Sequence, residues 1–148
     1  MTPVRLLRRA HRFSWDERLL LARTATNLAR ASMMIRTLPF RRVIATAELP
    51  AQAVVSPPDL PQRLVRAVEA GARYLPWRIV CFQKGLALHW MLRRAGFPSL
   101  LHYGVGQNGE RGLTAHVWVS LNGRVLVGAE EAAAHACLAT YPAAEAAP

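Results

Sequence analysis

Residues 80–96 read VCFQKGLALHWMLRRAG and predict a helix with a cysteine, Cys81, in its first turn. Apolar residues recur at helical spacing in two adjoining rows, so this helix should be buried. Gly96 and Pro98 then stop it. A thiol at the start of a helix lies near the positive end of the helix dipole, which favours the reactive thiolate. Taken alone, the pattern favours a buried structural cysteine, because free cysteines are often buried.

The composition indicates a folded chain without a membrane segment. The chain has 148 residues, 52% of them hydrophobic, which is enough for a core of its own. Two cysteines make no disulfide framework, and no apolar run suits a signal peptide or a membrane span. We therefore expect a cytoplasmic protein with no membrane association.

The formal net charge of +10 would attract nucleic acid or an acidic peptide. The arginines are scattered along predicted helices, and no basic motif is interleaved with aromatic residues. We therefore expect no nucleic-acid partner.

Four helical segments are predicted before the cysteine helix, at residues 3–12, 15–36, 41–49 and 59–76. The second begins at a capping box formed by Ser14 and Glu17. A proline-rich linker at residues 50–58 separates the third predicted helix from the fourth. We expect residues 1–50 to form an N-terminal helical extension and residues 51–148 to form the core, with both parts in one folded unit.

After the cysteine helix the pattern changes to strands and turns. Strands are predicted at residues 99–105, 113–121, 124–127 and 137–141, with a turn at 107–109. Asn122-Gly123 is a strong hairpin signal. The tail at 142–148 should be frayed. The fold class is therefore α+β, with N-terminal helices, the cysteine helix and a small antiparallel sheet.

His116 lies in the middle of the second predicted strand, 35 residues after Cys81. A cysteine protease or transamidase needs a thiolate, an imidazole that takes and returns a proton, and a group that orients the imidazole. Cys81 and His116 fit the first two roles, although a strand histidine can also be purely structural. Trp118 shares a strand face with His116 and either shields the imidazole or fills the core.

Several segments together resemble one family, the transglutaminase-like cysteine proteases of lasso-peptide biosynthesis in their stand-alone leader-peptidase form. The resemblance lies in residues 77–88, 92–96, 115–119 and 122–124, and more weakly in 15–42. It implies a transglutaminase/papain-like core in which the cysteine helix packs on a small antiparallel sheet. It also implies that the protein is a hydrolase acting in the maturation of a ribosomally made peptide.

The resemblance implies a role for each site residue. Cys81 would be the nucleophile and His116 the general base and acid. The backbone N–H of Cys81 would be one oxyanion donor, and Gln83 or a neighbouring residue would supply the second. The reaction would remove the leader peptide from a lasso-peptide precursor.

The resemblance also implies partners. A small leader-binding recognition protein would deliver the precursor peptide through its leader, and a separate asparagine-synthetase-like cyclase would close the released core. No cofactor is implied. The sequence has no zinc-site spacing and no phosphate loop.

The third catalytic residue departs from the family pattern. The family usually has an acid about where Val127-Gly128 stand in this chain, and the nearest acids here are Glu130 and Glu131. A three-residue bulged turn would pair His116 with Glu130, so we expect Glu130 to be the orienting carboxylate. There are three alternatives to Glu130 as the orienting group. Asn122 could take its place, or a backbone carbonyl could hold the histidine of a Cys–His dyad. Both glutamates could instead have only a surface role.

Two other functions use the same sequence features. A transglutaminase-like acyl or amide transferase would employ the same Cys81–His116 pair and pass the thioester to an amine. A non-catalytic basic adaptor would only bind a peptide.

Overall fold

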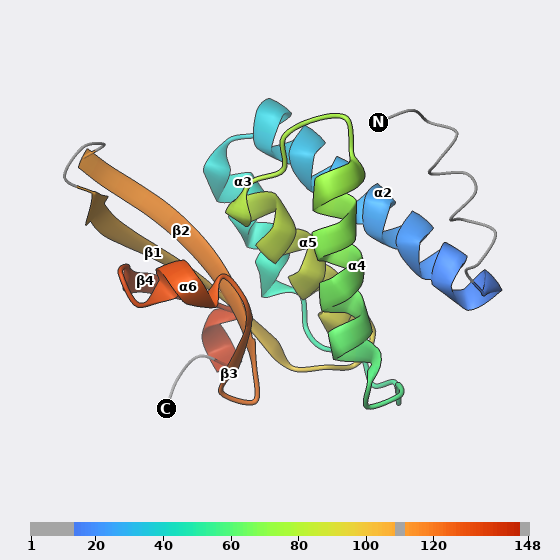
Figure 1. The fold of residues 1–148 in the computed structure, drawn as a ribbon. Coiled ribbons are helices and arrows are strands. Elements are labelled where there is room, and N and C mark those ends of the chain that lie inside the picture. Colours follow the sequence, from blue (N-terminus) through green and yellow to red (C-terminus); the bar gives the residue numbers. More distant parts are fainter. Residues whose placement is uncertain (1–13, 109–111, 146–148) are drawn as a thin grey trace.

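The computed structural model describes residues 14–108 and 112–145. They form an α+β fold in which helices pack against one face of a four-stranded antiparallel sheet (Figure 1). The predicted fold class is confirmed. The helix expected at residues 3–12 lies outside the described residues.

The long helix α2 (Trp15–Thr37) begins at the predicted capping box. The backbone N–H of Glu17 donates to Ser14 Oγ (3.2 Å), and the N–H of Ser14 donates to Glu17 Oε2 (2.8 Å). Two of the N–H groups at the helix start are thereby satisfied by local side chains. The helix then packs against α4 (Leu60–Tyr74) and α5 (Cys81–Arg94).

Prolines interrupt the helical structure between α2 and α4, as the sequence predicts. The helix expected at residues 41–49 is split into α3 (Phe40–Ala45) and the 3-10 helix η1 (Thr46–Glu48). The linker at residues 50–58 carries neither helix nor strand. Buried side chains from both sides of the linker share one hydrophobic core.

Helix α5 is the buried central helix that its sequence predicts. Ten of its residues are buried, among them Gly85. A Cβ atom at Gly85 would come within 2.7 Å of Val117 Cγ1, so the helix backbone lies directly against the sheet here. The absence of a side chain at Gly85 thus sets the distance between the cysteine helix and β2.

The strand order in the sheet is β3-β2-β1-β4. The strands are β1 (Ser99–Asn108), β2 (Gly112–Leu121), β3 (Arg124–Val127) and β4 (Ala136–Tyr141). All four predicted strands are confirmed, although β1 continues into the turn expected at 107–109. Val117 and Val119 of β2 face α5. Residues that alternate with them, including His116, therefore face the other side of the sheet, where α6 (Ala129–Ala132) lies.

The β2–β3 hairpin has a two-residue turn and a bulge. Asn122 (φ 50°) and Gly123 (φ 77°) both adopt the left-handed conformation that a tight hairpin turn requires. The strand register shifts by one residue at Leu126, so that Val119 pairs with Val127. The bulge determines which residues after β3 approach His116.

The chain is held in place as far as Glu145, which corrects the expectation of a frayed tail for residues 142–145, whereas residues 146–148 lie outside the described residues. The 3-10 helix η2 (Ala143–Glu145) ends at a carboxylate that binds the fully buried Arg93 through two hydrogen bonds of 2.5 and 2.7 Å. Arg93 also donates to the carbonyls of Leu49 and Ser99. The tail is thus anchored to α5 as far as Glu145.

His89 joins α5 to η1 and β1 through buried hydrogen bonds. Its Nε2 lies 2.9 Å from the Ala47 carbonyl and its Nδ1 lies 3.0 Å from Ser99 Oγ. Burial lowers the pKa of His89 to about 4. The ring is therefore neutral near pH 7, with Nε2–H donating to the carbonyl and Nδ1 accepting from the hydroxyl.

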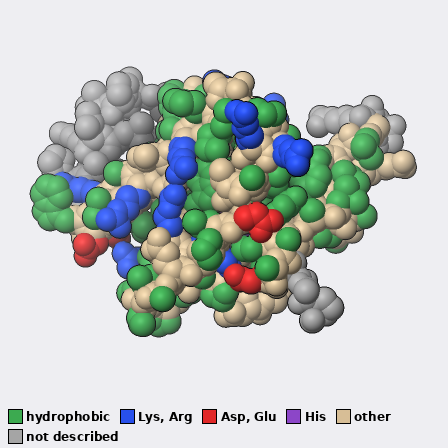
Figure 2. Space-filling model, turned by 180° about the vertical axis from the view of Figure 1, so that it is seen from behind, with side chains coloured by type: hydrophobic (Ala, Val, Ile, Leu, Met, Phe, Trp, Pro, Cys, Tyr) green, Lys and Arg blue, Asp and Glu red, His purple; other side chains and the backbone are tan. Residues whose placement is uncertain are grey.

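The surface carries its basic side chains in several separate places on the face shown in Figure 2, among hydrophobic and neutral ones. None of the described helices has the length and hydropathy of a membrane-spanning segment.

Candidate active site

Cys81 is the first residue of α5 and a free, partly exposed thiol. The first helical hydrogen bond of α5 runs from the backbone N–H of Lys84 to the Val80 carbonyl (3.2 Å). The N–H groups of residues 81–83 have no acceptor within the helix. The thiol therefore lies at the positive end of the helix dipole, where a thiolate or an oxyanion is stabilised.

Gln83 holds the start of this helix with its side chain. Its Oε1 accepts from the Val80 N–H (2.6 Å), and its Nε2 donates to Ser32 Oγ (3.3 Å), which also accepts from Trp77 Nε1 (3.1 Å). The buried amide thus ties the cysteine turn to α2. Only the backbone N–H of Gln83 remains for the oxyanion role expected from the sequence. Ser32 and Trp77 carry no sequence signal for this role, because their contacts with α5 are non-local.

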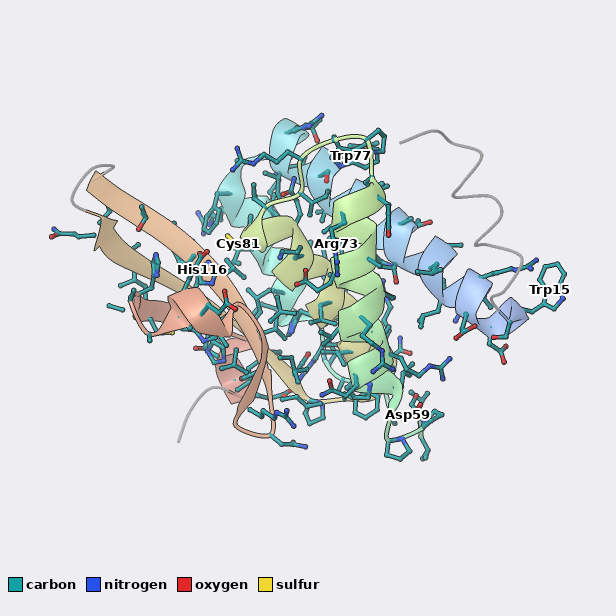
Figure 3. All side chains as sticks on the ribbon, in the orientation of Figure 1. Trp15, Asp59, Arg73, Trp77, Cys81 and His116 are labelled. Atoms are coloured by element: carbon teal, nitrogen blue, oxygen red, sulfur yellow. The ribbon has the colours of Figure 1, made fainter. Side chains whose placement is uncertain are left out.

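Cys81 and His116 line one cleft of about 710 Å³. Its walls come from α4, the segment before α5, the first turn of α5, β2, the end of β3, and α6. Figure 3 shows Cys81 at the start of α5 and His116 on β2. The two residues that the sequence singles out as nucleophile and base therefore line the same cleft.

His116 is held by a backbone carbonyl. Its Nε2 lies 3.1 Å from the Gly128 carbonyl oxygen, and its side chain is only 4% exposed. A carbonyl can only accept, so Nε2 carries the hydrogen and Nδ1 is the basic nitrogen of the neutral ring. Nδ1 is buried and has no hydrogen-bond partner among the described residues. This nitrogen faces the Glu131 carboxylate, whose Oε2 lies 2.9 Å away.

Gly128 can occupy this place only because it has no side chain. Its φ is +84°, and a Cβ atom would stand 2.8 Å from His116 Nε2 and 2.9 Å from the Val117 carbonyl oxygen. Gly128 also precedes α6 as its N-cap. This arrangement matches the alternative in which a backbone carbonyl orients the histidine.

Aromatic rings pack against His116. Trp118 lies nearly parallel to it, with ring centroids 6.1 Å apart, and also stacks on His102 at 5.4 Å. His135 approaches the His116 ring to 5.3 Å from the segment before β4. Nothing in the local sequence marks His135, because the sheet pairing of β4 with β1 carries it there.

The carboxylate against His116 is that of Glu131. Its Oε2 lies 2.9 Å from His116 Nδ1, whereas Glu130 lines the cleft without an ion pair to the histidine. Continuing the bulged register would have brought residue 130 opposite His116, but β3 ends at Val127 and the chain turns into α6. This corrects the expected position of the carboxylate. Gly128 before four helix-forming residues was the signal that the strand stops.

The second cysteine takes no part in the cleft. Cys137 lies exposed on the edge strand β4, and its nearest partners are Ala139 O and Thr140 Oγ1. Among the residues that the structure describes, no group of three or more histidine, cysteine or acidic side chains could hold a metal ion.

The cleft thus combines a thiol at a helix start, N–H groups beside it that have no acceptor within the helix, and a buried imidazole with a carboxylate 2.9 Å from its Nδ1. These are the parts of a site for nucleophilic acyl transfer through a thioester.

Comparison with known protein families agrees with this type of chemistry. The family model described as "Transglutaminase-like superfamily" matches residues 22–139, well over half of the chain. No curated protein and no solved structure matches significantly. The superfamily typically contains cysteine peptidases and transferases. The chain belongs to the transglutaminase-like superfamily.

Proposed function

We propose that this protein is a cysteine peptidase that removes the leader peptide from a lasso-peptide precursor. The observation that carries the catalytic part is the shared cleft, which is lined by Cys81 at the start of α5 and by His116 on β2. The choice of substrate is supported by the resemblance of residues 77–88 and 115–119 to lasso leader peptidases.

The proposed reaction has two halves. His116 Nδ1 takes the thiol proton of Cys81, and the thiolate attacks the carbonyl carbon of the scissile peptide bond. The N–H groups of the first turn of α5 stabilise the oxyanion. The C–N bond then breaks, and Nδ1–H protonates the leaving amine. A water molecule, deprotonated by Nδ1, hydrolyses the thioester and releases the leader with a free carboxylate.

The proposal includes partners. A small leader-binding protein would bring the precursor to the cleft, and an asparagine-synthetase-like cyclase would take the released core. The net charge of +10 favours a partner or leader with acidic residues. We expect this chemistry in the cytoplasm, where a ribosomally made precursor is first available.

The test uses the precursor peptide and the leader-binding protein encoded by neighbouring reading frames. Purified protein is incubated with both, and the products are identified by mass spectrometry. We expect cleavage at one leader–core bond, its loss in Cys81→Ala and its retention in Cys137→Ala. Cleavage by Cys81→Ala, or binding of the precursor without cleavage by the unaltered protein, would overturn the peptidase proposal.

An acyl or amide transferase is the second candidate, because the superfamily also contains transferases. The same thioester would then react with an amine in place of water. Adding a primary amine to the assay separates the two functions. An amide product formed in preference to the free acid would favour the transferase, and the free acid alone would favour the peptidase.

A further inference from the structure

A second cleft, of about 470 Å³, lies at the other end of α5 from Cys81. Its walls come from α2, the linker, the first half of α4 and the last turn of α5. It shares no lining residue with the active-site cleft. Figure 3 shows Cys81 and Asp59, the residue before α4, toward opposite ends of the α4–α5 pair. The second cleft is therefore a separate surface that the proposed reaction does not use.

The lining of the second cleft is mainly apolar. It includes Leu20 of α2, Leu60 and Leu64 of α4, Met91 of α5 and the partly exposed Val54 of the linker. A lining of this kind favours an apolar side chain over a phosphate or a sugar.

The linker wall of the second cleft is fixed to the end of α5. The backbone N–H of Gln52 donates to the carbonyl of the buried Arg93 (2.9 Å). The Val54 carbonyl lies so close to Gly96 that no side chain would fit there. The cleft is thus formed before any ligand binds, which lowers the entropy cost of binding.

Two arginines without an acidic partner line the second cleft. Arg23 and Arg94 are both exposed, and neither forms an ion pair with a described residue. Arg94 Nη1 donates to Asn27 Oδ1 (3.2 Å), and Asn27 Nδ2 donates to the Arg23 carbonyl (2.8 Å). Asp59, which lies next to the cleft in sequence, faces Arg63 at 3.9 Å. The cleft therefore complements a ligand that carries carboxylates beside an apolar side chain.

The distance between the two clefts suits one extended peptide. Arg94 follows Cys81 by thirteen residues on α5, which corresponds to about 20 Å along the helix at about 1.5 Å per residue. An extended peptide covers this distance with about six residues, at about 3.3 Å each. A precursor held at Cys81 can therefore reach the second cleft with a segment about six or more residues from the scissile bond. The leader is the better occupant, because the core is passed on to the cyclase.

We propose that the second cleft binds the leader of the precursor at an acidic segment that carries an apolar side chain. The apolar side chain enters between α2, α4 and α5, and the neighbouring carboxylates accept hydrogen bonds from Arg23 and Arg94. The inference rests on the proposed function, because it takes the precursor peptide as the substrate.

The test measures the binding of a fluorescently labelled synthetic leader peptide by anisotropy. All proteins carry Cys81→Ala, so that binding is observed without cleavage. The arginine variant carries Arg23→Gln and Arg94→Gln. Its control carries Arg36→Gln and Arg41→Gln, which are exposed arginines outside both clefts, so the two proteins have the same net charge.

A second pair of variants tests the apolar lining. Val54→Ser alters a residue of the cleft, whereas Val55→Ser alters its fully exposed neighbour, which does not line the cleft. We expect Val54→Ser to weaken leader binding about threefold, because less apolar surface is buried, and Val55→Ser to leave it unchanged.

In about 0.1 M salt we expect the arginine variant to bind the leader about fivefold to thirtyfold more weakly, and its control to stay within about twofold of the parent. The difference should shrink in about 1 M salt, which screens charge. In proteins that retain Cys81, the arginine changes should raise the KM for the precursor by a similar factor and leave kcat unaltered, because the second cleft touches no reacting atom. A precursor shortened to about four leader residues should not reach the second cleft and should be cleaved equally by parent and variant.

Equal binding by the arginine variant and its control would overturn the inference, because net charge alone would then account for the attraction. A loss of binding to the leader-binding protein, with the leader bound as before, would also overturn it and assign the cleft to that partner. Failure of the proposed function looks different. Leader binding that depends on Arg23 and Arg94, without cleavage, would keep this inference and reject the peptidase. Cleavage with an unaltered KM in the arginine variant would do the reverse.

Discussion

His116 Nε2 lies 3.1 Å from the carbonyl oxygen of Gly128, and the glycine has no room for a side chain on the face that the imidazole occupies. A backbone carbonyl therefore holds the Nε2 side of the imidazole. Replacement of Gly128 changes the site through geometry, without removing any polar atom.

Gly128→Ala should disable the site. Its Cβ would stand 2.8 Å from His116 Nε2, at a φ of +84° that strains any side chain. We expect a loss of stability of about 1–3 kcal/mol and at least a tenfold loss of precursor cleavage. Urea denaturation and the cleavage assay measure the two effects.

Gly123→Ala is the matched control, because Gly123 has a similar φ of +77° and a Cβ there would meet nothing within 4 Å. It should share the backbone strain and retain activity. Equal activity in the two variants would contradict a role for the Gly128 carbonyl.

Gln83→Ala should loosen the turn that carries Cys81. The variant removes the bonds from Gln83 to the Val80 N–H and to Ser32 Oγ, inside the core. We expect a stability loss of about 1–3 kcal/mol and slower alkylation of Cys81. Gln62→Ala, on the exposed face of α4, should change neither quantity. Unaltered alkylation in a destabilised Gln83→Ala protein would show that the amide supports the fold but not the thiol.

His89 should make the protein sensitive to mild acid. Burial lowers its pKa from 6.5 to about 4, so between these values the unfolded chain binds a proton that the folded chain does not. Stability should therefore fall as the pH drops from 6.5 toward 4, by about 3 kcal/mol. Urea denaturation at pH 7 and pH 4 measures this loss. In His89→Gln the loss should be smaller, whereas His135→Gln should behave as the parent does.

Glu145→Gln should weaken the anchor of the C-terminal tail. The hydrogen bond and charge of Arg93 lower the pKa of Glu145, so its contribution is present above the ordinary glutamate pKa and is lost as the pH falls through the lowered value. At neutral pH we expect a destabilisation of about 1–2 kcal/mol, reduced by the 42% exposure of Glu145. Thermal unfolding measures the melting temperatures of Glu145→Gln and of the control variant Glu130→Gln. Equal melting temperatures would mean that Arg93 needs no charge partner.

The elements that the sequence predicts well depend on local chemistry. The capping box at Ser14, the proline break before Phe40 and the Asn122-Gly123 turn each satisfy backbone groups within a few residues. The buried cysteine helix follows from its own apolar periodicity. For these elements a short window of sequence contains the interacting partners.

The anchoring of the C-terminal segment by Arg93 and the groups that contact His116 could not be predicted from a short window of sequence. Arg93 reads as a solvated C-terminal residue of α5, but it is fully buried because Glu145 and two carbonyls from distant segments surround it. The sequence favours Glu130 over Glu131 as the carboxylate at His116. Glu131 reaches His116 only because the chain bulges at Leu126 and then turns at Gly128.

By itself, the sequence determined the order of helices and strands, the place of Cys81 at a helix start, and the strand that carries His116. These depend on hydrogen bonds and apolar spacing along the chain. The tertiary structure alone decided that a carbonyl holds His116 and that Glu131 supplies the neighbouring charge. A shift of one residue in strand pairing changes which side chain meets the imidazole, and that shift depends on how the β2–β3 hairpin and α6 pack over the sheet.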